Sequence, residues 1–347
     1  MNPEFQLAFL NKIQRLFAEG DFTASYKYAL LIAIADIAVE SGTDDDQPLT
    51  IPHRRLGAKF IELYWQQAAP FRDGGVLIQN NGVQAAVISN IAQFRSQTQA
   101  ATVNAARFVV GFKSLLTKVT RIVVDKPVFH IQNLGGSRDQ FLFESGTDGI
   151  TLLPGIAFCL RRFQPLLQQL ARSHWIDHIK SNKQNATLLG QDNDLEVFLF
   201  ETSRQSLFIV QTGLRKISSK CFYCGSSITD ADVDHFIPHS LYPRDLAHNF
   251  VLAHQSCNRS KSDTLAAKAH LHRWLEFVQS NADDLSQIGY DAGIMADEGS
   301  MDSVARWGYA NAVAGGGQGW VKPNQYEPID GSYLKAWGMN NLIESSL

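Results

Sequence analysis

The sequence lacks any long hydrophobic run. Its longest uninterrupted apolar segment, residues 28–35, is eight residues long and stops at Asp36. A helix that spans a bilayer needs about 20 apolar residues. The first residues also lack the basic region, apolar run and small-residue cleavage site of a secretory signal. We therefore expect a cytoplasmic protein that makes no contact with a membrane.

The chain also has little excess charge, with 31 Lys and Arg against 34 Asp and Glu and a net charge of −3. This balance excludes a protein that coats nucleic acid with its whole surface. Charge is placed unevenly, however. Nine basic residues stand against five acidic ones between Arg204 and Arg273, whereas Glu276 to Asp302 holds seven acids and no Lys or Arg. The segment 204–273 therefore carries a local excess of four positive charges.

Cysteine is scarce, with four residues in 347, and three of the four stand at metal-ligand spacing. They form two pairs, Cys221-x-x-Cys224 and His254-x-x-Cys257, separated by 29 residues. Cys and His are the usual ligands of structural zinc, and a reducing compartment favours a metal over a disulfide. Four protein ligands leave no open position, so this zinc would hold the fold together. Unbound cysteines beside a chance His are the alternative, and Cys159 is most simply a buried small hydrophobe.

Internal repeats and low-complexity tracts are absent too, and the remaining pattern is mainly helical. Apolar spacing predicts helices over 3–18, 24–40, 51–67, 84–94, 101–119 and 157–179. The helix over 24–40 is apolar nearly all round, so we expect it at the centre of a core. Short strands are expected over 76–79, 121–132 and 140–144, residues 197–200 are left undecided, and Gly315 to Gly319 is expected to be a flexible loop.

Between the two ligand pairs the pattern is strand, loop, strand and helix. Residues 232–237 have strand character and residues 249–253 form a second strand. A helix should begin after Gln255, with Asn258 and Lys261 on one face. Adjacent residues of a strand point to opposite faces, so Asp234 and His235 can serve one site only where the strand ends or twists.

These residues carry a resemblance to the HNH endonuclease family, in the subset with a zinc knuckle. The order of His235, thirteen residues, Asn249, eight residues and Asn258 is similar to the family pattern. The segments DVDHFIPHS and NRSKSD resemble the HNH domains of RNA-guided CRISPR nucleases. Asn258 stands where the family name expects a His, as in many members, which leaves the metal preference open.

The resemblance implies a role for each matching residue. His235 would be the general base that takes a proton from the attacking water. Asp234 and Asn258 would hold one Mg²⁺ or Mn²⁺ ion that stabilises the phosphate and the leaving oxygen. Asn249 would fix the loop that orients His235, and Lys261 or Arg259 would contact the phosphates of the cleaved strand. His239 and His248 would either line the phosphate path or be solvated loop residues.

The expected fold class is α+β. Residues 1–202 would form a mainly helical N-terminal body with a small β element, and its role in target selection or sensing cannot be read from the sequence. Residues 203–275 would form the ββα-metal HNH module with its structural zinc. Residues 276–347 would form an α-rich C-terminal extension.

The function expected from this pattern is metal-dependent hydrolysis of phosphodiester bonds in double-stranded DNA, in restriction or anti-phage defence. Two alternatives remain. The module could be a zinc-stabilised nucleic-acid-binding domain without catalysis, or a nuclease subunit that acts only within a complex with a protein partner. The partner could also be a second copy of the chain, in a homodimer.

Overall fold

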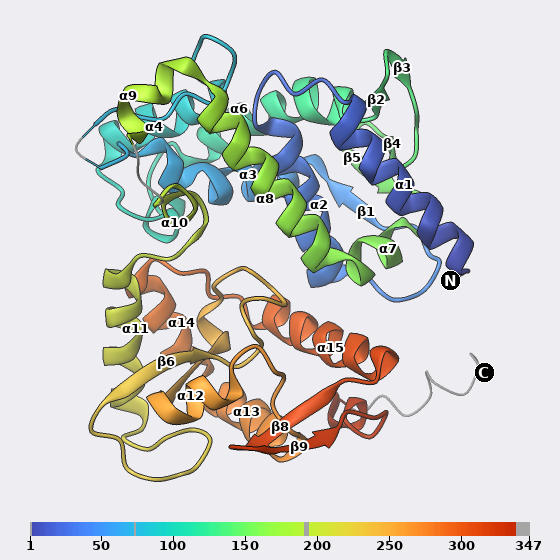
Figure 1. The fold of residues 1–347 in the computed structure, drawn as a ribbon. Helices are drawn as coiled ribbons and strands as arrows, with labels where there is room; N and C mark the ends of the chain where they lie inside the picture. The colour runs from blue at the N-terminus through green and yellow to red at the C-terminus, as the bar shows by residue number, and fades with distance from the viewer. Residues whose placement is uncertain (1, 73, 191–193, 338–347) are drawn as a thin grey trace. The chain divides into compact units, whose positions relative to one another are not determined.

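The computed structural model describes residues 2–72, 74–190 and 194–337, and it consists of two compact units. The first unit extends to Glu201 and the second begins at Thr202. Figure 1 draws the first unit in blue to yellow-green and the second in yellow-green to red.

The first unit is built from helices and two small antiparallel sheets. Its helices are α1 (Pro3–Glu19), α2 (Tyr26–Ser41), α3 (His53–Trp65), η1 (Gln66–Ala68), α4 (Ala86–Thr98), α5 (Val103–Arg107), α6 (Phe112–Val123), η2 (Val124–Val128, a π-helix), α7 (Ile156–Arg162), α8 (Gln164–Ser181), η3 (Lys183–Asn185), α9 (Ala186–Leu189) and α10 (Leu195–Phe200). Its strands are β1 (Thr50–Pro52), β2 (Asn133–Leu134), β3 (Ser137–Arg138), β4 (Phe143–Ser145) and β5 (Gly149–Leu152). One sheet has the order β1-β5-β4, and β2 pairs with β3.

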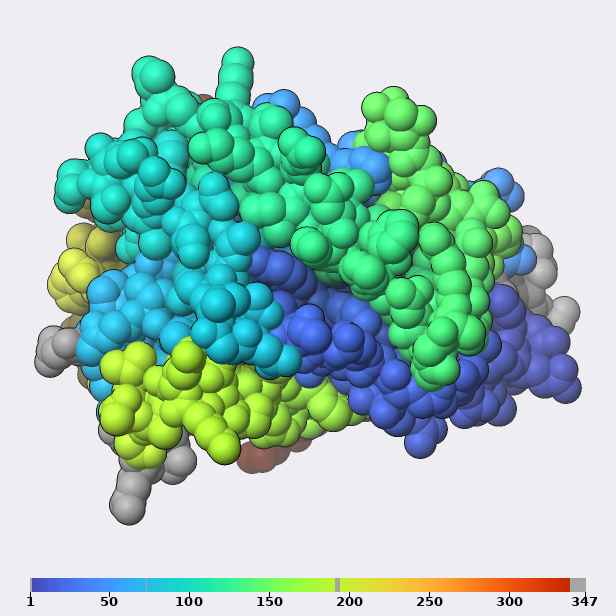
Figure 2. Space-filling view, turned by 90° about the horizontal axis from the view of Figure 1, so that it is seen from above, coloured from blue at the N-terminus to red at the C-terminus, as the bar shows by residue number. Residues whose placement is uncertain are grey.

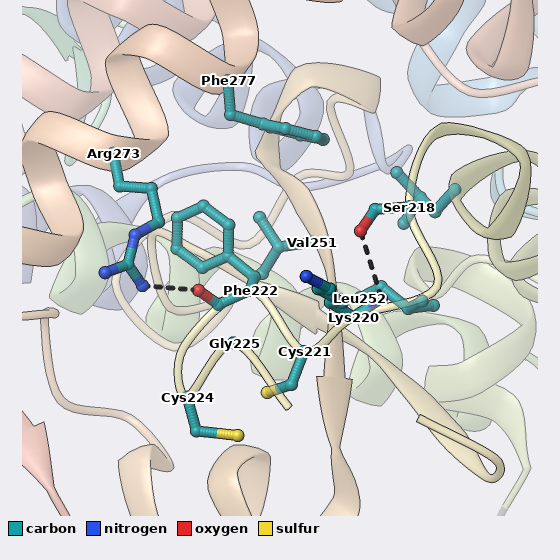
Figure 3. Close-up of a pocket in the computed structure, with 11 residues that line it drawn as sticks. Ser218, Lys220, Cys221, Phe222, Cys224, Gly225, Val251, Leu252, Arg273 and Phe277 are labelled. Carbon is teal, nitrogen blue, oxygen red and sulfur yellow. Dashed lines mark hydrogen bonds between the residues drawn. The ribbon is translucent and has the colours of Figure 1, made fainter. Parts of the chain in front are cut away.

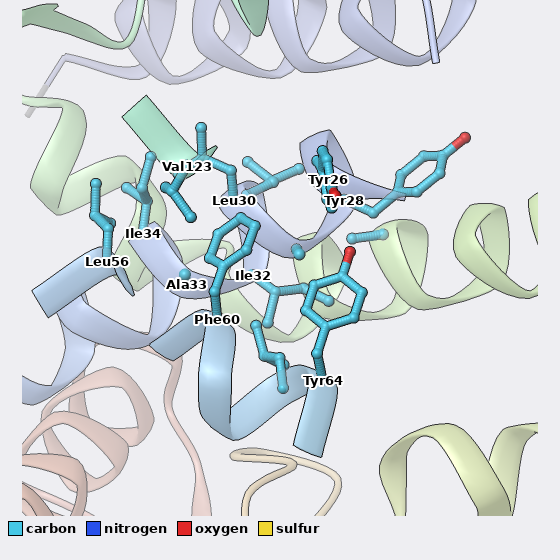
Figure 4. Packing of buried hydrophobic residues seen from close by; sticks show 14 of the residues in the cluster. Tyr26, Tyr28, Leu30, Ile32, Ala33, Ile34, Leu56, Phe60, Tyr64 and Val123 are labelled. Carbon is cyan, nitrogen blue, oxygen red and sulfur yellow. The ribbon is translucent and has the colours of Figure 1, made fainter. Parts of the chain in front are cut away.

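Helix α2 is the centre of this unit, as its all-round apolar sequence predicted. Every residue from Tyr26 to Glu40 is buried, and α2 packs against α3, α7 and α8. Leu30 and Ile34 of α2 lie beside Phe60 of α3 in the core (Figure 4). Because this helix is enclosed on all sides, its burial exceeds that of an ordinary surface helix with one apolar stripe.

Some expected elements are wrong. Residues 121–132 were expected to be a strand from their β-branched content, but residues 121–128 belong to α6 and η2. Val119, Val123 and Ile131 are buried at spacings of four and eight, which is a helical period. The expected strand at 76–79 has no strand conformation. The expected helix over 101–119 is interrupted at Gly111, whose φ of +98° suits glycine.

The undecided residues 197–200 belong to the helix α10. The helix expected over 157–179 is two helices that meet at Phe163. Pro165 lies in the first turn of the second helix, α8. Proline is tolerated there because that turn has no intrahelical partner for its backbone N–H.

The second unit surrounds one small hairpin with helices and adds a second hairpin. Its helices are α11 (Arg204–Ile217), η4 (Ala247–Asn249), α12 (Gln255–Lys261), α13 (Lys268–Ser280), α14 (Ala282–Ala292), α15 (Glu298–Gly315) and η5 (Leu334–Trp337). Its strands are β6 (Ala231–His235), β7 (Phe250–His254), β8 (Gln318–Lys322) and β9 (Gln325–Pro328). Together the two units give the α+β class that the sequence predicted.

Strands β6 and β7 pair antiparallel, with Asp234 opposite Val251 and His235 opposite Phe250. Helix α12 follows β7 directly and packs on both strands. This is the strand, loop, strand and helix order that the sequence predicted.

The segment after residue 275 packs on α12 and on the residues that follow it. Trp320 of β8 accepts from the Ala267 backbone and donates to Leu265, and its indole Nε1 donates to Ser260 Oγ at 3.0 Å. Helix α14 packs on α11. The expected flexible loop at Gly315 to Gly319 is wrong, since α15 ends at Gly315 and β8 begins at Gln318. Within the described ranges, every helix is too short or too polar to cross a bilayer.

Candidate functional site

The two ligand pairs converge on one point. The ligand atoms of Cys221, Cys224, His254 and Cys257 all lie within 4.8 Å of one another. With Zn–S distances near 2.3 Å, a tetrahedral site has edges of roughly 3.8 Å, so a small contraction of this group would enclose the ion. Three thiols and one imidazole are also the donors that zinc prefers. The group is therefore a candidate structural zinc site.

The backbone of the knuckle shapes this site. The Gly225 N–H donates to the Cys221 carbonyl at 2.9 Å, and Gly225 adopts φ of +73°, a value that most residues avoid. His254 turns Nδ1 toward Cys224 Sγ at 3.3 Å and Nε2 toward the Ser227 carbonyl at 3.2 Å. A carbonyl at Nε2 holds the proton on that nitrogen, which leaves Nδ1 as the ligand atom.

The protonation of the thiols also fits a cation. Burial alone would raise the pKa of Cys224, but hydrogen bonds from Ser226 and its contacts with Cys221 and His254 lower that pKa to about 6. Burial and the neighbouring thiols Cys221 and Cys224 raise the pKa of Cys257 to about 12. Without a cation, repulsion between neighbouring thiolates keeps the three cysteines from all losing their protons. A bound cation would stabilise all three thiolates, which are the form that binds a metal.

A pocket of about 280 Å³ adjoins the knuckle (Figure 3). It is lined by the knuckle, by Val251 and Leu252 of β7 and by Phe277 of α13. Arg273 closes one side and donates to the carbonyls of Phe222 and Tyr223 at 2.8 and 3.0 Å. None of the expected catalytic side chains lines this pocket, so it belongs to the packing of the knuckle on its helices.

His235 is the last residue of β6, and its side chain is 24% exposed. Its ring packs against Phe250, with centroids 4.8 Å apart. Its Nε2 lies 2.5 Å from Oδ1 of Asp245. Burial would raise the pKa of Asp245, but the hydrogen bond and the charge of His235 outweigh it and lower that pKa. Asp245 is therefore a charged partner that fixes the orientation of the imidazole.

Asp234, adjacent in the chain, is buried and has different partners. Its Oδ2 accepts from the Tyr223 hydroxyl at 2.5 Å and lies 3.2 Å from Lys261 Nζ. The same Nζ donates to the His235 carbonyl at 2.9 Å. Burial lowers the pKa of Lys261, and Asp234 opposes that shift; burial and Asp234 raise the pKa of Tyr223. A lysine with no exposed surface thus connects the carboxylate to the strand end.

The two asparagines lie on either side of this pair. Asn249 is buried, and its side-chain amide makes two hydrogen bonds with the backbone of Ile237. Its Oδ1 accepts from the Ile237 N–H at 2.8 Å, and its Nδ2 donates to the Ile237 carbonyl at 2.9 Å. These contacts lie two residues after His235; that they fix the loop that orients His235 stays a prediction. Asn258 of α12 donates from Nδ2 to Asp232 Oδ2 at 3.2 Å. Asp232 and Asp234 lie on the same face of β6 because they are two residues apart.

The two residues expected to hold the divalent ion have other partners in the structure, Tyr223 and Lys261 for Asp234 and Asp232 for Asn258. Asp234 and Asn258 offer a carboxylate and an amide oxygen, ligands suited to Mg²⁺ or Mn²⁺. The hydrogen bond from Asn258 Nδ2 to Asp232 places the amide oxygen on the other side of that group. In the part of the chain that the structure describes, the cysteine–histidine group is the only cluster of three or more His, Cys, Asp or Glu ligands. An ion here would therefore complete its shell with water and substrate oxygens, as Mg²⁺ commonly does.

Two expectations need correction. Lys261 or Arg259 was expected to contact the phosphates of the cleaved strand, but the Lys261 ammonium is buried against Asp234 and the His235 carbonyl. Arg259, on the same helix, is exposed instead. His248 was expected to be a solvated loop residue or to line the phosphate path, but it is buried beside Ser286 of α14. His239 does lie near His235, with ring centroids 5.3 Å apart.

Sequence reasoning missed Asp245, Tyr223 and Asp232 as partners of the expected site residues. Asp245 could have been noticed, because it is the only acid between His235 and Asn249. Asp232 could have been noticed from its two-residue spacing to Asp234 on a strand. Tyr223 has no such signal, since its position between two cysteines explains it equally well as packing.

Comparisons with known proteins assign both parts of the chain. A family model described as HNH endonuclease matches residues 221–267, and one described as domain of unknown function (DUF8808) matches residues 6–195, more than half of the chain. No curated protein and no solved structure matches. The chain therefore belongs to the DUF8808 family and carries, after that domain, a module of the HNH endonuclease family with a Cys3His group suited to zinc.

Proposed function

We propose that this protein is a metal-dependent endonuclease that hydrolyses phosphodiester bonds in double-stranded DNA. The observation that carries the proposal is the pairing of His235 with Asp245 at the end of β6, directly after Asp234, which Lys261 and Tyr223 hold in place. A family match over residues 221–267 supports a nucleic-acid substrate.

In this proposal His235 is the general base. The Nε2–H of His235 donates a hydrogen bond to the Asp245 carboxylate, so Nδ1 keeps the lone pair that removes a proton from the attacking water. The imidazole then becomes positively charged. The carboxylate of Asp245 stabilises that charge at a hydrogen-bond distance of 2.5 Å.

Asp234 and Asn258 would hold a Mg²⁺ or Mn²⁺ ion that supplies charge stabilisation for the phosphate and the leaving oxygen. Tyr223 and Lys261 keep the Asp234 carboxylate fixed on the β6 face. Lys261 also holds the backbone of His235, so it positions both residues at once. Asn249 keeps the chain after His235 in register through Ile237. Arg259, exposed on α12, would contact phosphate.

Plasmid cleavage by the purified full chain tests this proposal. We expect nicking or linearisation in the presence of Mg²⁺ or Mn²⁺, loss of cleavage after brief chelation and recovery when Mg²⁺ is returned. Zinc content should stay at one ion per chain throughout. A protein that binds plasmid and never cleaves it with any divalent ion, while retaining zinc, would be a binding module and would refute the proposal.

The biological role that we propose is restriction or anti-phage defence. A nuclease module that follows a separate domain of more than half the chain fits target selection by that domain. Cells that express the protein should plate a sensitive phage at lower efficiency than cells with the His235→Ala variant. Equal plating of a broad phage panel by both strains would argue against defence.

A further inference from the structure

The N-terminal unit contains a long segment without acidic residues. From residue 74 to residue 124 the sequence holds no Asp or Glu, although the whole chain has 34 of them. The same segment holds five basic residues: Arg95, Arg107, Lys113, Lys118 and Arg121. Such a bias in an otherwise slightly acidic protein points to an anionic partner.

The structure gathers much of this charge on one side of α6. Leu115, Leu116, Val119 and Val123 form the buried side of α6, which packs on α3 and α4. The opposite side carries Lys113, Lys118 and Arg121, all exposed, and η2 adds exposed Lys126. In Figure 2 the chain from α4 to the β2–β3 hairpin, cyan to green, covers a continuous area of this unit.

Three of these four cations have no acidic partner among the described residues of the protein, whereas the fourth, Arg121, pairs with Asp125 of the same helical segment. Arg121 lies 3.5 Å from Asp125. Among the residues that the structure describes, no carboxylate lies within ion-pair distance of Lys113, Lys118 or Lys126. From Lys113 to Lys126 the helical rise gives a row about 20 Å long. Exposed Ser114 and Thr117 stand between the lysines, and hydroxyls are common donors to phosphate. We call this row, residues 113–126, the α6 stripe.

An exposed apolar tip adjoins the N-terminal end of the stripe. Phe108 is 80% exposed and Val110 is 95% exposed in the turn between α5 and α6. Gly111, with its positive φ, lets that turn lead directly into α6. Large apolar side chains at such exposure are costly unless a partner covers them.

A cationic row beside an apolar tip can meet either DNA or an anionic membrane. The apolar side of α6 is buried in the core, so the helix cannot lie in a bilayer with that side inserted, as membrane-surface helices do. The exposed side of α6 carries lysine and hydroxyl side chains, with the apolar residues Phe108 and Val110 at its N-terminal end. Many proteins that bind the minor groove of DNA combine phosphate contacts with apolar side chains inserted between base steps.

We propose that the α6 stripe is a binding surface for duplex DNA, with Lys113, Lys118 and Lys126 on phosphates and Phe108 and Val110 as an apolar wedge. The choice of DNA rests on the proposed function, whereas the anionic character of the partner rests on the stripe itself. The surface would contribute affinity that is largely independent of sequence.

The test measures binding without cleavage. The full chain carrying His235→Ala is titrated with a fluorescent 30-base-pair duplex without added divalent ion, over a series of salt concentrations. The Lys113→Gln/Lys118→Gln double variant is compared with Lys180→Gln/Lys183→Gln, which replaces two exposed lysines of α8 and η3. Circular dichroism and thermal melting establish that both double variants fold as the parent does.

We expect the stripe variant to bind at least tenfold more weakly at about 100 mM salt, with the slope of log K against log salt reduced by about 1.8, or 0.9 for each lost phosphate contact. The α8 variant should bind like its parent. Phe108→Ser should weaken binding about fivefold or more at every salt concentration with an unchanged slope, because its contact is not ionic.

Equal DNA binding by the stripe variant and its parent would overturn the proposal. So would parental binding to vesicles containing 30% phosphatidylserine that exceeds binding to DNA and is lost in the stripe variant. Because this test measures no cleavage, its result does not depend on whether the protein proves to be a nuclease. If the protein cleaves DNA but the stripe variant binds DNA as well as its parent, only the present inference is refuted.

Discussion

Replacing Asp245 by Asn removes a negative charge from the Nε2 side of His235 and changes the volume of the side chain little. Asp245 is nearly buried, with 11% of its side chain exposed, and its carboxylate lies 2.5 Å from the imidazole. A hydrogen bond to a charged group contributes about 1.5–3 kcal/mol. If that contribution is made when the imidazole is charged, its loss lowers kcat by about 10- to 150-fold, since 1.36 kcal/mol is a factor of ten.

Multiple-turnover cleavage of a labelled duplex at saturating Mg²⁺, over a series of duplex concentrations, measures kcat and KM. We expect kcat to fall while KM stays within about twofold, because Asp245 acts on the base and not on substrate binding. The ring-nitrogen NMR signals of His235 should also change, because a neutral amide replaces the charged carboxylate that holds the proton on Nε2. Asp230→Asn, an exposed acid just before β6, is the matched control and should leave both constants unchanged. An unchanged kcat for Asp245→Asn, or a loss explained by KM alone, would refute the positioning role.

Three further predictions concern the same module. Lys261→Met leaves the buried Asp234 carboxylate without its cation and should lower the free energy of unfolding, measured in urea, by about 3–5 kcal/mol. Lys216→Met, at an exposed lysine, is the control and should change the free energy of unfolding by less than about 0.5 kcal/mol. Equal stability of the two variants would contradict the buried ion pair. Cys257→Ala should abolish stoichiometric zinc and loosen residues 221–261, whereas Cys159→Ala, in the core of the first unit, should keep its zinc; metal analysis and hydrogen exchange decide between these outcomes. Asn258→Ala should raise the Mg²⁺ concentration for half-maximal cleavage by at least tenfold with little change in DNA binding, and an unchanged Mg²⁺ requirement would exclude Asn258 as a ligand.

The sequence was most informative where chemistry restricts the spacing of residues. The pairs Cys221–Cys224 and His254–Cys257 can bind one metal ion only if the chain between them folds back on itself. The antiparallel strands β6 and β7, followed by α12, bring the two pairs together. The all-round apolar helix α2 was readable for a similar reason, because only a fully enclosed position suits it.

Contacts that depend on distant parts of the chain could not be read. Lys261 looks solvated in the sequence, but Trp320, about 60 residues later, packs on the adjoining segment and on Tyr223. Asp245 reaches His235 only through the conformation of the loop between His235 and Asn249. Two hydrogen bonds between the Asn249 side chain and the Ile237 backbone stabilise that loop. Residues 121–132 misled because their composition suits strands while their buried positions repeat with a helical period.

Cleavage by the His235→Ala variant tests the central claim most directly. Plasmid cleavage with Mg²⁺ should fall by at least about 10²-fold, the contribution of a general base, while zinc content, thermal stability and duplex binding match the parent. His272→Ala, on the exposed surface of α13, should cleave like the parent. Cleavage by His235→Ala at the parental rate, with zinc retained, would contradict the assignment of His235 as the base of this site.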